Sequence, residues 1–174
     1  MKKYFYSLII LFVFVAPFSV VAQDEAPKRP ENMGVSDFDT FKNNSFDIMD
    51  ESSKLKTDAT KIDTDVKGYA GGLAGVSVDK LKTDLKALKG ISKSSKELST
   101  RIGSLKEQSK QMLSSAKSVK PMTKSPQATN NTNKSIKGLD ASKKNIDGVG
   151  TLVETNTKLL TDELKRRGET VEED

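Results

Sequence analysis

The sequence has no His, no Cys and no Trp. Their absence removes the commonest general base, the thiolate nucleophile and the usual zinc and haem ligands. Because no disulfide can form, the folded chain must hold together by packing alone. A lipid anchor on a cysteine is excluded for the same reason. We therefore expect no catalytic residue, no metal site and no cofactor.

The sequence also lacks a nucleotide-binding loop and a nucleophile elbow. The glycine-rich segment 68–75 has neither the lysine nor the preceding strand that a phosphate-binding loop requires. Asp63 and Asp65 suggest a loose calcium site, but their spacing departs from the calcium-loop pattern, and a solvated helix face is favoured. The sequence thus predicts a protein that is not an enzyme.

Long apolar stretches are scarce and are confined to the start of the chain. Two lysines precede an apolar run at 8–15, and small or branched residues at 20–22 come directly before Gln23. This order is typical of a cleaved secretory signal peptide, here residues 1–22. The alternative is a membrane anchor, for which the run is shorter than the ~20 residues that a spanning helix needs. We predict a periplasmic or extracellular protein of a bacterial envelope, with no transmembrane segment after cleavage.

Apolar and small residues recur every three or four positions after this leader, which is the period of one helix face. This first seam comprises Phe38, Phe41, Ser45, Ile48, Ser52, Leu55, Ala59, Ile62, Val66, Tyr69 and Leu73. It predicts a helix over 36–67, with Ser36 as its N-cap. Residues 23–35 are charged, contain two prolines and have little to bury, so we predict a disordered arm there.

Four glycines in segment 68–75 interrupt the first seam. Each would destabilise a helix interior by about 1 kcal/mol, so a turn is favoured. The heptad phase nevertheless continues through this segment, which leaves a kinked continuous helix as the alternative. A second helix is predicted over 77–119. Its seam comprises Val78, Leu81, Leu85, Leu88, Ile91, Ser95, Leu98, Ile102, Leu105, Ser109, Met112, Ala116 and Val119.

A third helix is predicted over 128–167, with Gly168 suited to the position after its end. Its seam comprises Thr132, Ile136, Leu139, Lys143, Ile146, Gly150, Val153, Thr157, Leu160 and Leu164, with support from Val149, Leu152 and Leu159. Lys143 and three glycines weaken this seam, so we expect the first two helices to form the stable hairpin and the third to loosen most easily. Short connectors predict an all-α fold, an elongated antiparallel three-helix bundle over 36–168. An acidic tail, 169–174, follows.

Aromatic residues make up only 6% of the chain, and the seams contain many small side chains. Such seams remove little apolar area from water, so we expect a lone protomer to be marginally stable. A protein partner or self-association through the helix seams would compensate.

Charge is distributed unevenly around a formal net charge of +5. Acids follow one edge of the first helix at Asp37, Glu51, Asp58 and Asp65. The second helix carries a basic stripe at Lys82, Lys86, Lys89, Lys93 and Lys96. The favoured interpretation is that the two edges pair with each other. The alternative is an exposed basic face for anionic lipid or glycan. No nucleic acid is expected as a partner, because no aromatic residues interleave with the lysines.

These patterns together predict a secreted or periplasmic, non-enzymatic helical protein with a structural or interaction role in the cell envelope. The alternative function is a binding module for an anionic envelope surface, through the five lysines of the basic stripe.

Overall fold

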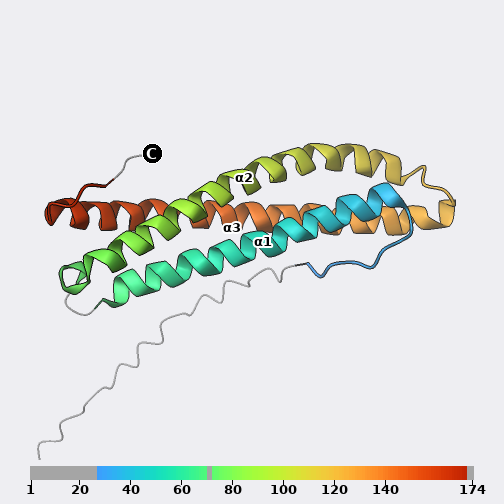
Figure 1. Cartoon of the computed structure of the whole chain (residues 1–174). Helices are drawn as coiled ribbons and strands as arrows, with labels where there is room; N and C mark the ends of the chain where they lie inside the picture. The colour runs from blue at the N-terminus through green and yellow to red at the C-terminus, as the bar shows by residue number, and fades with distance from the viewer. Residues whose placement is uncertain (1–26, 70–71, 172–174) are drawn as a thin grey trace, which may run out of the picture.

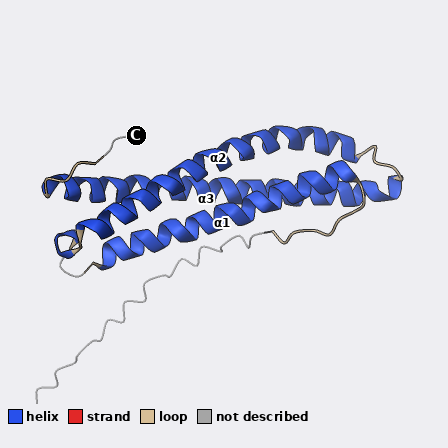
Figure 2. Cartoon of the chain, viewed as in Figure 1, coloured by secondary structure: helices blue, strands red, loops and turns tan. Residues whose placement is uncertain are grey.

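The fold is a bundle of three long helices, each antiparallel to the helix that precedes it in the sequence (Figure 1). The computed structural model describes residues 27–69 and 72–171. Within these residues the chain forms helices and loops but no strand (Figure 2). The helices are α1 (Ser36–Gly68), α2 (Val78–Ala116) and α3 (Ser125–Arg166), with short 3₁₀ turns η1 (Leu73–Gly75) and η2 (Met122–Lys124) between them. The predicted all-α antiparallel bundle is confirmed, whereas the predicted leader, 1–22, lies outside the described residues.

The seams predicted for α1 and α2 are the faces that the bundle buries. Phe38, Phe41 and Ile48 of α1 are buried, and so are Leu81, Leu88 and Leu98 of α2. Every predicted seam position of α2 is at least half-buried. Burial of these side chains supplies the main favourable free energy of folding, at about 25 cal/mol per Å² of apolar surface.

The seam predicted for α3 is partly wrong. Lys143 is exposed and pairs with Asp147, with 2.8 Å between Lys143 Nζ and Asp147 Oδ2. At four positions the buried residue is the one before the predicted residue. These buried residues are Ser135, Ser142, Val149 and Asn156, of which only Val149 was expected to support the seam. Of the predicted residues, Ile136 and Thr157 are half-buried, whereas Lys143 and Gly150 are exposed.

The reason is that α3 is the central helix of the bundle. It contacts α1 and α2 about equally, while α1 and α2 contact each other much less. A helix between two neighbours buries a wider face than a single stripe. Ser135 and Ser142 can turn inward because their hydroxyls donate to the carbonyls of Asn131 and Gly138, at 2.9 and 2.8 Å. We expected α1 and α2 to form the stable hairpin, but each of them packs more extensively on α3 than on the other.

The start of α1 also differs from the prediction. Val35, not Ser36, is the N-cap residue, and its side chain makes no capping hydrogen bond. Instead the Asp39 carboxylate accepts hydrogen bonds from three backbone N–H groups, those of Met33 at 2.8 Å, Gly34 at 2.8 Å and Val35 at 3.2 Å. One carboxylate thus fixes the chain that enters the helix.

The prediction of a disordered arm over 23–35 is wrong for residues 27–35, which pack against the bundle. Buried Lys42 donates through Nζ to the carbonyl of Pro30, at 2.9 Å, and to the side-chain oxygen of Asn32. Asn131 of α3 donates to the carbonyl of Glu31 at 3.2 Å. Because these polar partners lie on two different helices, the sequence around the arm gave no sign of them. Residues 23–26 lie outside the described part of the chain.

The turn predicted at 68–75 is confirmed, and the kinked continuous helix is excluded, because α1 ends at Gly68 and α2 returns antiparallel to it. Ser77 caps α2 by accepting a hydrogen bond from the Lys80 backbone N–H at 3.3 Å. At the other end of the bundle α3 begins at Ser125, three residues earlier than predicted, and α2 ends at Ala116, three residues earlier than predicted.

Candidate functional site

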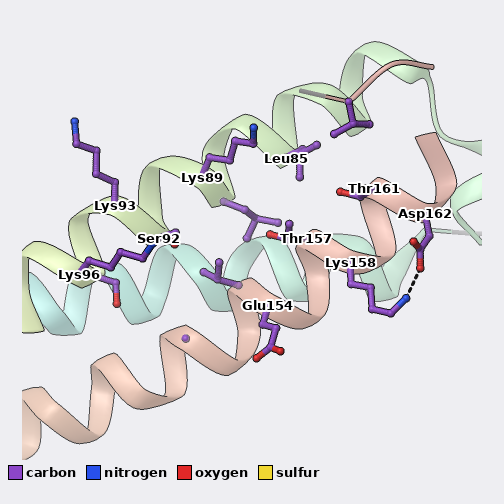
Figure 3. Close-up of a pocket in the computed structure, with 15 residues that line it drawn as sticks. Leu85, Lys89, Ser92, Lys93, Lys96, Glu154, Thr157, Lys158, Thr161 and Asp162 are labelled. Atoms are coloured by element: carbon purple, nitrogen blue, oxygen red, sulfur yellow. Dashed lines mark hydrogen bonds and ion pairs between the residues drawn. The ribbon is translucent and has the colours of Figure 1, made fainter. Parts of the chain in front are cut away.

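A groove of about 770 Å³ lies between α2 and α3. Figure 3 shows residues of both helices facing each other across it. The lining residues are Leu85, Leu88, Lys89, Ser92, Lys93, Ser95 and Lys96 of α2, Gly150, Val153, Glu154, Thr157, Lys158, Thr161 and Asp162 of α3, and Val171 of the C-terminal segment. The groove is thus formed by two helices together with one residue of the C-terminal segment.

The floor of the groove is apolar and its sides are built from small residues. Leu85, Leu88 and Val153 are buried and belong to the bundle core. Ser92, Thr157 and Gly150 are too short to fill the space between the two helices. A Cβ atom added at Gly150 would meet nothing within 4 Å. The groove is therefore open on the Gly150 side above its apolar floor.

The α2 wall of the groove carries three of the five lysines of the predicted basic stripe. Lys89 is half-buried, whereas Lys93 and Lys96 are exposed. The structure brings these three together beside α3, a neighbour that the sequence did not indicate for them. Lys86 is exposed and does not line the groove.

The remaining lysine of the stripe, Lys82, pairs with the C-terminal segment. Its Nζ lies 2.7 Å from a carboxylate oxygen of Glu169. Of the acidic edge predicted on α1, Glu51 pairs with Arg101, at 2.6 Å. Lys82 and Glu51 therefore do not follow the interpretation in which the two predicted edges pair with each other.

No pattern in the sequence predicted that α3 would form the second wall of the groove. It presents Glu154, Lys158 and Asp162, and the last two form an ion pair of 2.6 Å, drawn as a dashed line in Figure 3. These residues occupy exposed positions of a helix whose inward face was assigned one residue too late at several turns. Gly150 could have indicated this wall, because a glycine leaves open space on the helix surface. We interpreted it instead as a residue that weakens the seam of the third helix.

A polar cluster at the end of α3 determines where the C-terminal segment starts. The Glu163 carboxylate accepts hydrogen bonds from Arg166 and Arg167, which lower the pKa of Glu163 from 4.5 to about 2. Arg167 also donates to the carbonyls of Val76, at 2.5 Å, and Leu73 in the α1–α2 turn. These contacts join the end of α3 to the turn beside the start of α2.

A second buried polar cluster joins α1 to α3. Asp63 accepts a hydrogen bond from Lys67 at 2.7 Å and one from the buried amide of Asn156 at 3.1 Å. The Lys67 contact and then the Asn156 contact hold the pKa of Asp63 below its usual range. Asp63 thus faces α3 rather than a solvated ion site. Among the described residues no group of three or more acids is placed to hold a metal ion.

None of the helices in the described part of the chain is long and apolar enough to cross a membrane. Comparisons of the chain with known protein families, with curated proteins and with solved structures found no match.

Proposed function

We propose that the protein is a non-enzymatic interaction protein of the bacterial cell envelope, and that it binds an acidic, apolar-anchored segment of a partner protein in the α2–α3 groove. One observation carries this proposal: an apolar floor lies between walls that present four lysines and two acids. A binding site that combines apolar burial with an excess of one charge favours an amphipathic segment of the opposite charge.

The partner surface in this proposal is the groove and not the helix seams, because the seams are buried against each other within the chain. A smaller hollow of about 580 Å³ on α1 serves as a comparison. It is lined entirely by Lys, Thr and Asp side chains of that one helix, so it has no apolar floor. Of these two hollows in the described part of the chain, the α2–α3 groove is the one that combines an apolar floor with charged walls.

The envelope location rests on the predicted signal peptide, residues 1–22. Export would place the groove in the periplasm or outside the cell. The absence of Cys is compatible with either, since no thiol needs protection from oxidation.

Site-specific photo-crosslinking in the native envelope tests the proposal. A photo-reactive amino acid replaces Lys93 on the groove wall, and the matched control carries it in place of Lys61, an exposed residue of α1. We expect the Lys93 variant to form an adduct with another envelope protein, at a segment rich in Asp and Glu with an apolar residue among them. Equal adduct formation from both positions, or an adduct at a basic segment, would contradict the proposal.

The second candidate function is binding of an anionic envelope surface, either lipid or glycan. It is favoured by the exposure of Lys86, Lys93 and Lys96 along one side of α2. Bulky apolar anchors of the kind found on membrane-surface helices are few, since the large exposed hydrophobic residues in the described part of the chain are Met122 and Leu159.

Co-sedimentation with phosphatidylglycerol vesicles separates this second candidate from the first. The test variant reverses charge at Lys86, Lys89 and Lys93, and the control reverses Lys110, Lys117 and Lys144, which gives the same net charge elsewhere on the bundle. A specific basic face predicts that only the first variant loses salt-sensitive binding. If both variants bind as the wild type does, this second candidate fails.

A further inference from the structure

The N-terminal arm, residues 27–35, lies along α1 without forming a helix of its own (Figure 1). The Met33 N–H donates to Asp39 at 2.8 Å, whereas Arg29 pairs with Asp47 at 2.7 Å. Four steps along the arm therefore run beside eight steps of the helix. Eight helical residues rise about 12 Å, and four extended residues span up to about 14 Å. The arm thus follows α1 as a nearly extended chain.

Two buried side chains hold the arm by its backbone. Lys42 of α1 donates to the carbonyl of Pro30 at 2.9 Å, and Asn131 of α3 donates to the carbonyl of Glu31 at 3.2 Å. Met33 is the apolar anchor of the arm and belongs to the core. An extended chain can be held in this way because its backbone groups are not paired with each other, as they are inside a helix.

The arm also carries one charge that matches two charges of the helix. Arg29 bridges Asp47 and Asp50, at 2.7 and 2.9 Å, and these two acids are neighbours on the surface of α1. Lys93 and Lys96, on the α2 wall of the groove, have the same three-residue spacing and the opposite charge. Figure 3 shows Lys93 pointing away from α3, but its flexible stem lets the exposed ammonium turn over the groove. A single carboxylate can therefore bridge the two lysines.

The α2–α3 groove offers hydrogen-bonding groups on both walls. The hydroxyls that line it belong to Ser92 and Ser95 of α2 and to Thr157 and Thr161 of α3. Within the described residues none of these four hydroxyls makes a hydrogen bond. Ser142, by contrast, donates to a carbonyl of its own helix at 2.8 Å. The groove hydroxyls are thus available to a bound chain whose backbone groups are unpaired.

From these observations we infer that the α2–α3 groove binds its partner as an extended peptide and not as a fourth helix. The peptide places an apolar side chain over Leu88 and Val153, a carboxylate between Lys93 and Lys96, and its backbone against the groove hydroxyls. A partner helix would leave those hydroxyls unused, because its backbone groups are already paired. A volume of about 770 Å³ is typical of sites for small ligands and suits a few extended residues. This inference rests on the proposed function and adds the conformation of the partner to it.

Titration of the isotope-labelled full chain with two synthetic peptides, followed by NMR chemical shifts, tests the inference. Both peptides carry one Leu and one Glu on the same side and have the same net charge. Flanking prolines hold one peptide extended, and a hydrocarbon staple holds the other as a helix. We expect the extended peptide to cause saturable shifts at residues 88–96 and 150–161, and to bind about tenfold or more tightly than the helical peptide.

The lysine bridge has a test of its own in the same titration. The double variant Lys93→Glu with Lys96→Glu should bind the extended peptide about tenfold or more weakly, because it repels the carboxylate. The matched control is Lys110→Glu with Lys117→Glu, which changes the net charge equally at exposed positions of α2. The control should bind as the wild type does. Thermal midpoints of both variants check that the bundle is folded.

Tighter or equal binding of the helical peptide would overturn the inference, and so would the absence of shifts with both peptides. Equal loss of binding in the two lysine variants would overturn the carboxylate bridge. None of these results changes the crosslink expected at Lys93, which tests the proposed function separately. An adduct to a helix of the partner would leave that function standing and remove this inference alone.

Discussion

Asp39 shows how much a single polar side chain can decide in this chain. It accepts three backbone hydrogen bonds, and together with Lys42 it places residues 27–35 against the bundle. Asp39 lies in the first turn of α1, where an acid is favoured by the helix dipole whether or not it contacts the preceding chain. Its partners precede it by four to six residues in a segment rich in proline and charge, so composition alone predicted disorder there.

We predict that Asp39→Ala destabilises the protein by about 1–2 kcal/mol more than Asp37→Ala, because only Asp39 accepts hydrogen bonds from the entering chain. Both acids lie in the first turn of α1, so the helix-dipole contribution is common to the two variants. Urea unfolding of both variants measures the difference. Equal destabilisation would show that the three hydrogen bonds add nothing.

Glu163 gives the protein a defined acid sensitivity. Its folded-state pKa is lowered to about 2 by Arg166 and Arg167. The stabilisation is therefore fully present above the unfolded-state pKa near 4.5 and is lost as the pH falls toward about 2. We predict that Glu163→Gln lowers the thermal midpoint at neutral pH, and that the gap to the wild type narrows below pH 4.5.

The control for this prediction is Glu154→Gln, at an exposed acid of the same helix. Thermal unfolding followed by circular dichroism across pH measures both variants. A Glu163→Gln midpoint that runs parallel to the wild type down to pH 2 would refute the assignment.

At the scale of the helices, apolar spacing predicted the two outer helices well and the central one poorly. The seam of α2 could be predicted because Leu, Ile and Met occupy most of its inward positions. The inward positions of α3 include Ser135, Ser142 and Asn156, which carry no apolar signal. The groove could not be predicted at all, since it depends on how α2 and α3 lie relative to each other.

We predict that the centre of α3 is the slowest part of the chain to exchange its amide hydrogens. It packs on both α1 and α2, so it cannot open locally without disturbing both neighbours. Native-state hydrogen exchange with mass spectrometry compares residues 135–160 with residues 45–60 of α1. Faster exchange in α3 than in α1 would restore the hairpin of α1 and α2 as the stable unit.

At the scale of the whole molecule, the core is divided between the two ends of the bundle. One cluster contains Phe38, Phe41, Met112 and Leu139, and the other contains Leu81, Leu88, Val149, Leu160 and Leu164. Leu55 packs against both clusters. The elongated shape thus carries one continuous but narrow core, and its groove lies beside the second cluster.

We predict that the isolated chain melts cooperatively at a midpoint that does not depend on protein concentration, because the three helix seams are buried within one chain. Circular dichroism melts over a wide concentration range, combined with light scattering, measure this. A midpoint that rises with concentration would instead show that self-association stabilises the fold, as the small side chains of the seams suggest from sequence alone.

If the α2–α3 groove is the binding face of the molecule, a bulky side chain on its α3 side should prevent the partner from entering. Gly150 lines the groove and Gly148 does not, while a Cβ atom at either would meet nothing within 4 Å. The measurement is the yield of the Lys93 crosslink in the native envelope for Gly150→Leu and Gly148→Leu, with thermal midpoints checked for both. We predict that Gly150→Leu abolishes the crosslink and that Gly148→Leu retains it. Equal yields in the two variants would contradict it.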